Sequence, residues 1–261
     1  MSTSETKGPP SVSATEPGKP PGLPAIDVNE YGGKREGERQ AMNRRLFMQL
    51  LVFDVPARNA DEVARGLLTQ LREKHVPAVV YADTMDPRGV GLLTWSEEPA
   101  MFVTQVRPLF HHLLRDVVLR PDMAMIGRSY STGHEPDLAF ALLERPVKNV
   151  LDERFPWHVW YPLRRTGEFA GLEPIDQSHI LREHASIGMA YGAQELAHDI
   201  RLACHGLDTK DNEFVIGLVG PTLQPLSHLV QTMRKTRQTR EFIQQMGPFF
   251  VGHVLGRSSG G

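Results

Sequence analysis

The sequence predicts an α+β fold made of two halves, each with its elements in the order β-α-β-β-α-β. Nearly continuous apolar runs, which are typical of buried strands, occur at 46–55 and 157–163. After each run come a segment with apolar residues at helical spacing and then two apolar runs joined by a turn-rich segment. The same order therefore occurs twice, at an offset of about 120 residues. This is the ferredoxin-like plan, and two such halves can join their sheets into one barrel-like core with helices outside.

The N-terminal half begins near Arg45. Pro56 ends its first apolar run, and Asn59 followed by Glu62 resembles the capping box that begins a helix. The apolar stripe of this helix continues to about His75. Its members are Val63, Leu67, Leu68 and Leu71.

Two strands are expected next, at 78–82 and 90–95, around a connection that contains Pro87 and Gly89. Ser96 can then cap a helix that extends to about residue 110. The segment 117–126 is apolar enough for the last strand of this half, before a polar break at 128–137.

The C-terminal half repeats this order after its first strand at 157–163. A helix over 177–191 is entered through Pro174 and capped by Asp176, and Thr222 caps a second helix. The second helix has an apolar stripe of Leu226, Leu229, Val230 and Met233. The remaining strands are expected at 198–205, 214–219 and 248–255.

Composition sets the class of the protein and excludes several functions. With 40% hydrophobic and 23% charged residues, the 261-residue chain is typical of globular proteins. The net charge of −2 provides no general attraction for nucleic acid, and one cysteine, Cys204, excludes an intramolecular disulfide. The sequence contains neither a signal-peptide core nor an apolar segment long enough to span a membrane, so we expect a cytoplasmic protein.

Residues 1–44 differ from the rest of the chain. Six of the twenty prolines lie in the first 24 positions, among many Ser, Thr, Gly and charged residues. Such a segment cannot bury enough apolar surface to fold alone, so we expect a disordered tail. The predicted organisation is thus a tail at 1–44, an N-terminal half at 45–150 and a C-terminal half at 151–257.

One histidine on the helix at 177–191 is the first candidate for chemistry. At helical spacing, Ile180, His184 and Ile187 share a face with Tyr191, while charged residues occupy the other face. A histidine on an apolar face is either a structural residue satisfied by hydrogen bonds or a metal ligand in a dry pocket. The helix alone leaves both interpretations open.

Five motifs in the C-terminal half narrow this choice. They are WYPLRR (160–165), LREHASIGMAYG (181–192), HGLDTKDNEF (205–214), MRKTRQT (233–239) and GPFFVG (247–252). Together they resemble the chlorite dismutase family, which includes the coproheme decarboxylases of bacterial haem synthesis. The resemblance covers roughly residues 45–256, and in the N-terminal half it depends mainly on layout. It implies a dimeric α/β-barrel protomer, often assembled as a homopentamer, with haem b or coproheme in the C-terminal half.

The resemblance also implies roles for single residues. His184 matches the family's proximal histidine, the one protein ligand of the haem iron. Tyr161 matches the tyrosine that coproheme decarboxylases oxidise to a radical, which attacks a substrate propionate. Thr239 falls where that subgroup has a serine near a propionate, and Arg164 is a nearby cation for another propionate or for a surface ion pair.

The distal side of the haem departs from the family pattern. True chlorite dismutases have a distal arginine there, and many coproheme decarboxylases have glutamine. The matching position is Asp199, and Arg201 follows on the same face of the strand. A carboxylate would disfavour an anionic substrate, whereas Arg201 could serve if the strand register shifted by two residues. Met189 also replaces a propionate-binding arginine of some coproheme decarboxylases.

The leading hypothesis is a coproheme decarboxylase. It would bind iron coproporphyrin III through His184, use hydrogen peroxide to form haem b, and employ Tyr161 as redox residue with Arg201 or Asp199 on the distal side. Two alternatives are chlorite dismutation to chloride and oxygen, and a haem-binding protein of the same fold without turnover.

Overall fold

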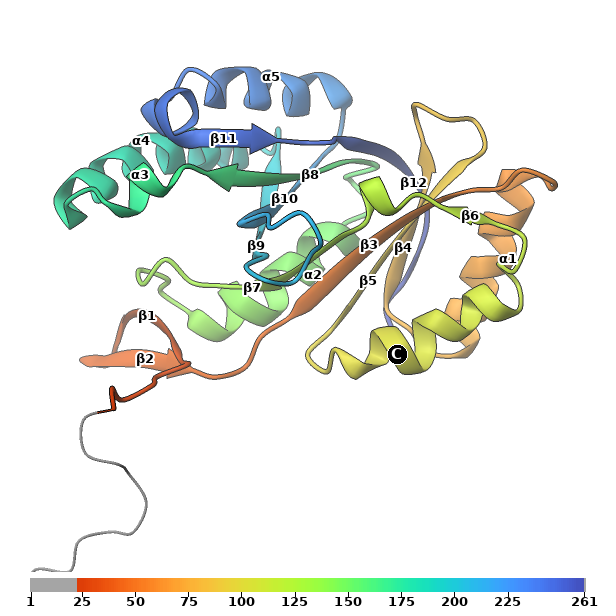
Figure 1. Ribbon diagram of the computed structural model, residues 1–261, viewed down its shortest axis with the longest axis horizontal. Helices are drawn as coiled ribbons and strands as arrows, with labels where there is room; N and C mark the ends of the chain where they lie inside the picture. The colour runs from red at the N-terminus through yellow and green to blue at the C-terminus, as the bar shows by residue number, and fades with distance from the viewer. Residues whose placement is uncertain (1–22, 261) are drawn as a thin grey trace, which may run out of the picture.

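A computed structural model describes residues 23–260 of the chain (Figure 1). The strands are β1 (Glu30–Arg35), β2 (Glu38–Met42), β3 (Phe47–Asp54), β4 (Ala78–Asp83), β5 (Gly89–Ser96), β6 (Val118–Leu119), β7 (Met125–Ser129), β8 (Trp157–Arg165), β9 (His198–Ala203), β10 (Phe214–Gly220), β11 (Ile243–Met246) and β12 (Phe250–Ser258). The α-helices are α1 (Ala60–Glu73), α2 (Arg145–Leu151), α3 (Gly167–Ala170), α4 (Pro174–Ala193) and α5 (Leu223–Met233). Short π and 3-10 turns occupy 102–111, 121–123, 140–144 and 238–242.

The predicted mixed fold of two ferredoxin-like halves is confirmed by the strand order. In the first half the order is β7-β3-β5-β4, and in the second it is β12-β8-β10-β9, so both halves have the same arrangement. The halves join where β4 pairs with β12 and where β7 pairs with β9. Because β10 pairs with both β9 and β8, the sequence of hydrogen-bonded strand pairs closes on itself. The predicted boundary at 150/151 falls at the end of α2 and remains a prediction.

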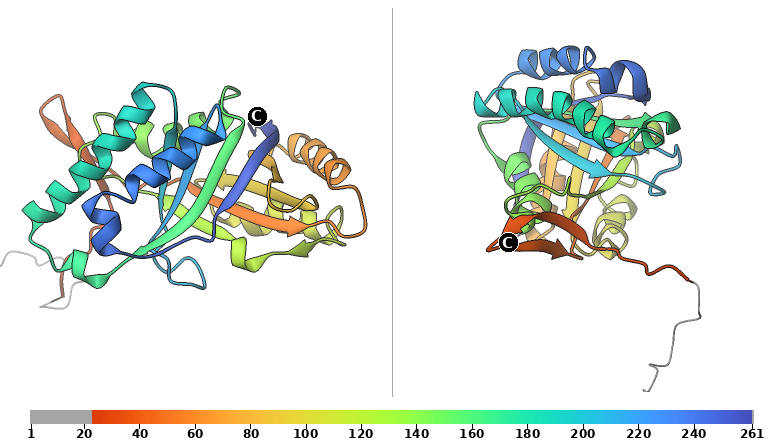
Figure 2. Two further views of the ribbon diagram at one scale, coloured as in Figure 1. Left: turned by 90° about the horizontal axis from the view of Figure 1, so that it is seen from above. Right: turned by 90° about the vertical axis from the view of Figure 1, so that its left-hand side faces the viewer.

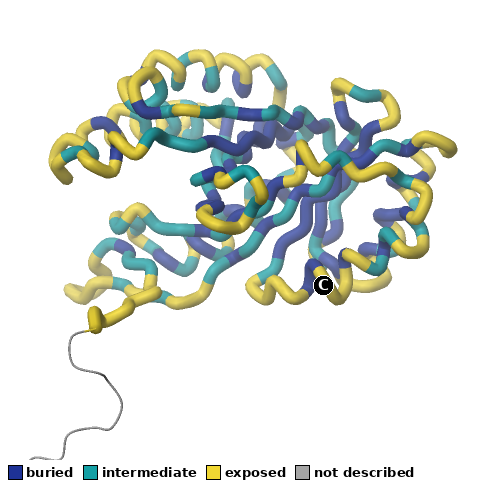
Figure 3. Tube along the Cα trace, in the orientation of Figure 1, coloured by how far each residue is buried: buried dark blue, intermediate teal, exposed yellow. Residues whose placement is uncertain are grey.

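Three apolar clusters follow from the alternation of side chains on these strands. One cluster fills the inside of the ring of strands and includes Met48, Trp160 and Phe250. A second lies under α1, and a third lies on the outer face of β8 and β10 under α5. Figure 2 shows α4 and α5 side by side over this outer face, and Figure 3 shows the buried backbone concentrated in the central strands.

The N-terminal segment is not entirely a disordered tail. Residues 30–42 form an antiparallel hairpin, with Glu36 and Gly37 at positive φ in its turn. The side chains of Glu30 and Gln40 hold this hairpin to residues 128–138. These contacts join residues that are far apart in the sequence, so the sequence pattern does not reveal them. The prediction for 1–44 is therefore wrong at 30–42, and its part at 1–22 lies outside the described residues.

Several predicted boundaries also need correction. Asp176 lies within the first turn of α4, because the helix already begins at Pro174 with Glu173 at the N-cap. The strand expected at 117–126 is divided into β6 and β7 by a 3-10 turn that begins at Pro121. The helix expected after Ser96 consists largely of π and 3-10 turns, with Pro108 in the second turn. Of the helices in residues 23–260, none has both the length and the apolar composition needed to cross a membrane.

Candidate functional site

Three residues of the outer face lie in one row across three strands. Tyr161 of β8 pairs with Ile216 of β10, and Ile216 pairs with Arg201 of β9. Neighbouring strands lie about 4.8 Å apart, so the backbones of Tyr161 and Arg201 are roughly 10 Å apart. The adjacent row contains Asp199, which pairs with Leu218. The structure thus brings together Tyr161, Asp199 and Arg201 from separate parts of the sequence.

His184 lies on α4 with the face that the sequence predicts. Ile180 is buried in a small cluster with Phe169 and Phe242, and Ile187 is half-buried beside the apolar cluster of β8 and α5. Arg182 and Glu183 are exposed. The helix also approaches α5 closely at Gly188, where an added Cβ would lie 3.7 Å from Met233 Cε. This packing fixes the side of α4 from which His184 extends.

One neighbour determines the state of the His184 ring. Thr236 Oγ1 lies 3.4 Å from His184 Nδ1, and the same hydroxyl donates to Met233 O at 2.7 Å. Because this hydroxyl donates elsewhere, it accepts a long hydrogen bond from Nδ1–H, and the unprotonated nitrogen is Nε2. Within residues 23–260, Nε2 forms no hydrogen bond. Its lone pair is therefore available to a ligand.

Burial lowers the pKa of the His184 imidazole below its ordinary value, and the positive charge of Arg201 lowers it further. The negative charges of Asp199 and Glu183 oppose this shift. The imidazole is consequently kept neutral at neutral pH, which is the form that binds metals.

Arg201 and Asp199 form an ion pair in which Nε lies 2.9 Å from Oδ2. Their side chains remain 34% and 39% exposed, so solvent reaches both. Residues 199 and 201 point to the same face, as predicted from strand alternation. The face opposite α4 therefore carries a cation that its neighbour already neutralises, and a free anion meets less positive charge than Arg201 alone would provide.

Tyr161 is 6% exposed, and its ring stacks on Phe249 with centroids 4.6 Å apart. Burial raises the pKa of the Tyr161 phenol well above its ordinary value. The negative charge of Asp199 raises it further, and the positive charge of Arg234 lowers it slightly. The hydroxyl therefore keeps its proton at neutral pH. It presents a protonated phenol in an apolar wall, with a carboxylate nearby.

The two other predicted site residues lie at the margin of this arrangement. Thr239 Oγ1 lies 3.3 Å from Thr236 Oγ1, which makes it a neighbour of the residue that holds His184. Arg164 donates to Lys210 O and to Gln245 Oε1, both at 3.3 Å. Strand alternation directs Arg164 away from the face of Tyr161. Its assignment to a propionate remains a prediction.

Sequence reasoning missed Thr236 and Tyr130. Thr236 lies inside the motif 233–239, but its contact with His184 depends on how α5 packs against α4. Tyr130 directly follows β7, whose register places Ser129 opposite Leu202 and so brings residue 130 next to Arg201. The polar composition of 128–137 gave only a loop signal.

This donor set fits a metal that has a single protein ligand. Among the described residues, no group of three or more His, Cys, Asp or Glu side chains could enclose a bare metal ion. A metal at His184 Nε2 would therefore need its other ligands from a prosthetic group, as in a haem with one axial histidine. The apolar wall around Tyr161 and Ile216 suits a flat apolar ring system.

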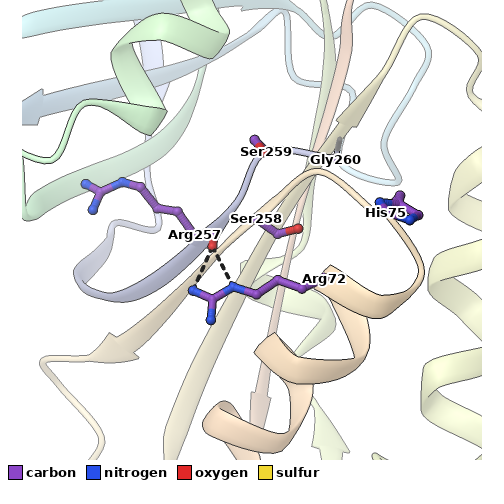
Figure 4. Close-up of a pocket in the computed structure, with 6 residues that line it drawn as sticks. All are labelled: Arg72, His75, Arg257, Ser258, Ser259 and Gly260. Carbon is purple, nitrogen blue, oxygen red and sulfur yellow. Dashed lines mark hydrogen bonds between the residues drawn. The ribbon is translucent and has the colours of Figure 1, made fainter.

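Two surface cavities of the described residues are lined by side chains other than His184. One, of about 300 Å³, is lined by Arg72, His75 and residues 257–260, and Arg72 donates to Arg257 O across it (Figure 4). The other, of about 250 Å³, lies beside Arg165 and α3. Tyr161, Ile216, Arg201 and His184 line neither cavity, although Arg164 lines the second, so the candidate site is defined by side-chain chemistry.

Comparisons with known proteins agree with this geometry. Residues 140–255, which include every residue of the row, match the family model for chlorite dismutase. A search of curated proteins finds no match to this chain.

Solved structures have the same fold over most of the chain. A candidate chlorite dismutase matches with a TM-score of 0.67 at 14% identity, over 82% of this chain and 96% of the other. A haem-binding protein from Thermus thermophilus matches with a TM-score of 0.64 at 15% identity, over 82% and 92%. Chlorite dismutase from Candidatus Nitrospira defluvii, in complex with imidazole, matches with a TM-score of 0.62 at 14% identity, over 81% and 91%. The match to the chlorite dismutase family model thus covers the part of the chain that carries His184, Tyr161 and Arg201, and the solved structures share the fold of the chain.

Proposed function

We propose that the chain is a haem-binding oxidoreductase in which His184 Nε2 is the single protein ligand of the iron. The observation that carries this proposal is the state of the His184 ring, whose Nδ1 bonds to Thr236 and whose Nε2, among the described residues, keeps its lone pair free for a ligand. A thermophile protein of similar fold is described as haem-binding. A bound haem would supply redox chemistry at its iron, which the side chains of this site cannot supply themselves.

The specific reaction that we propose is the peroxide-dependent decarboxylation of coproheme to haem b. It is supported by Tyr161, a buried phenol in the same row as Arg201. Its raised pKa keeps the hydroxyl hydrogen in place until oxidation, so Tyr161 can lose a hydrogen atom and later regain one from a propionate side chain. Thr239 is proposed to hold a propionate by its hydroxyl.

The Asp199–Arg201 pair would act on hydrogen peroxide. Asp199 can accept a proton from peroxide, and Arg201 can stabilise the negative charge that develops. The same pairing disfavours a substrate that arrives as an anion, because Asp199 offsets the positive charge of Arg201. This electrostatic balance favours peroxide over chlorite.

The test is product analysis of the coproheme-loaded chain with hydrogen peroxide. Mass spectrometry should show the loss of carbon dioxide from two propionates, and Tyr161→Phe should abolish it while coproheme still binds. Tyr31→Phe is a matched control, because the Tyr31 hydroxyl donates to Asp27 and lies outside the row of Tyr161. If the parent chain binds coproheme through His184 and no carbon dioxide is lost, the decarboxylase proposal is wrong.

Chlorite dismutation is the second candidate, and the position of Arg201 favours it. Arg201 lies on the outer face of the sheet, and its positive charge lowers the pKa of the His184 imidazole. Oxygen release from chlorite that disappears in Arg201→Ala would support this reaction over decarboxylation. Haem binding without turnover of either oxidant would instead indicate a haem-handling role.

The cytoplasmic location and homopentameric assembly are also proposals, supported by the match to the chlorite dismutase family model. Light scattering of the purified chain tests the assembly. A mass of five protomers is expected, and a monomer at micromolar concentration would contradict it.

A further inference from the structure

The hairpin β1–β2 is attached to one segment of the chain, residues 128–138. Figure 1 shows the hairpin next to the segment that follows β7, at the same end of the molecule as α4, and Figure 2 shows the same proximity. Two side chains, Glu30 at the start of β1 and Gln40 in β2, make most of the side-chain contacts. Their partners are about a hundred residues away in the sequence.

Glu30 links the hairpin to the beginning of this segment. Its Oε2 accepts hydrogen bonds from Ser131 N at 3.0 Å and from Ser131 Oγ at 3.2 Å. Its Oε1 accepts from Arg128 Nη1 at 3.2 Å and pairs with Arg45 Nε at 3.4 Å. The Glu30 and Arg45 side chains are only 18% and 10% exposed, so these charges are shielded from solvent. Charge-assisted bonds in such surroundings are stronger than surface ion pairs.

Gln40 links the hairpin to the end of the segment. Its Oε1 accepts from Leu138 N at 3.0 Å, and its Nε2 donates to Glu135 O at 3.2 Å and to Pro136 O at 3.1 Å. Gly33 N also donates to Glu135 O at 2.8 Å. Both ends of the segment 131–138 are therefore attached to the hairpin by bonds to backbone atoms.

The same segment borders the row at Arg201. In the pairing of β7 with β9, Arg128 lies opposite Ala203 and Ser129 opposite Leu202. Continued by one residue, this register places Tyr130 opposite Arg201, and the Tyr130 ring packs on Phe214 with centroids 5.4 Å apart. Ser131, which Glu30 holds, is the next residue in the chain.

We propose that the hairpin is a latch, formed by Glu30 and Gln40, which fixes the segment 130–138 as a wall of the His184 site beside Arg201. Glu30 and Gln40 are then positioning residues, because they act through Tyr130 and its neighbours and do not touch the row. The attachment of the segment follows from the contacts above, and its role at the site depends on the proposed function. Without the latch, the wall moves away and small ligands reach the site faster.

Hydrogen exchange of the full chain without haem tests the attachment. Glu30→Ala should accelerate exchange at the Ser131 amide, and Gln40→Ala should accelerate it at the Leu138 amide, by about 10- to 100-fold for the loss of one strong acceptor. Glu97→Ala is the matched control, since it removes a surface carboxylate that pairs with Arg44 at 2.7 Å without touching the segment. Unchanged protection at both amides in both variants would overturn the proposal.

A second measurement tests the role at the site. In the haem-loaded chain, Glu30→Ala and Gln40→Ala should raise the association rate of cyanide several-fold with the absorption spectrum of the unliganded form unchanged. Equal rates in parent, variants and control, together with faster amide exchange, would refute the wall and leave the attachment intact. If the chain takes up no haem, the proposed function fails, while the exchange experiment still decides whether the hairpin holds the segment.

Discussion

Acid is expected to destabilise the chain through His158, which lies on β8 three residues before Tyr161. His158 is 0% exposed inside the ring of strands. Its Nδ1 lies 2.9 Å from the Tyr81 hydroxyl, and its Nε2 lies 3.1 Å from Phe155 O. The carbonyl can only accept, so Nε2 carries the proton and Nδ1 accepts from Tyr81. Protonation of Nδ1 would break this arrangement and bury a charge.

The magnitude follows from the pKa of this group. Burial, with a smaller effect of Arg257, lowers the pKa of His158 from 6.5 to about 3. Above about pH 6.5 both folded and unfolded chains hold a neutral ring, and stability is complete. As the pH falls from about 6.5 toward 3, only the unfolded chain takes up the proton, at a cost to folding of about 1.4 kcal/mol per pH unit. The loss between about pH 7.5 and pH 5 is therefore about 2 kcal/mol.

Urea unfolding at these two pH values measures this loss. His158→Gln cannot titrate, so its free energy of unfolding should fall by about 2 kcal/mol less than that of the parent over the same interval. The variant should be less stable than the parent at neutral pH, since it loses a buried ring. His112→Gln, at an exposed histidine, is the control for the substitution itself. An equal pH dependence in parent and His158→Gln would refute the reasoning.

Three other perturbations have defined outcomes. Asn59→Ala should lower the free energy of unfolding by about 1 kcal/mol in urea, because Asn59 Oδ1 accepts from two backbone amides at the start of α1; no change would show that the cap contributes nothing. Gly217→Ala should lower it by about 1–3 kcal/mol, since the added Cβ would lie 2.6 Å from the Trp160 ring; a variant of parental melting temperature would contradict this packing. Asp199→Asn removes the negative charge that neutralises Arg201, so azide should bind the haem-loaded chain more tightly. The expected gain is on the order of 1 kcal/mol, after allowance for the exposure of both side chains. Weaker azide binding would show that this pair does not lie beside the bound anion.

The regular elements could be predicted because their signals are local. The apolar run at 46–55 became β3, and the capping signal at Asn59 became a real cap whose side chain accepts from the backbone. The faces of α4 and β9 also followed from spacing alone, since alternation and helical periodicity are properties of each element. Elements with conflicting local signals, such as the segment after Ser96, were assigned less well.

The candidate site was only partly predictable. Alternation put Asp199 and Arg201 on one face, but their position in a row with Tyr161 depends on the register of two strand pairs, which the sequence does not encode locally. Thr236 was missed for a similar reason, because it meets His184 only through helix packing. The hairpin at 30–42 was missed because its stability comes from long-range bonds to residues 128–138, while its composition is that of a flexible segment.

The assignment of His184 as an iron ligand is tested most directly by titrating haem into the parent chain, His184→Ala and His179→Ala. His179 is an exposed histidine on the same helix, so its variant controls for the loss of an imidazole from α4. We expect the parent and His179→Ala to give the same histidine-ligated absorption spectrum, and His184→Ala to lose it. An unchanged spectrum in His184→Ala would contradict the account, since the lone pair of Nε2 would then have no part in binding.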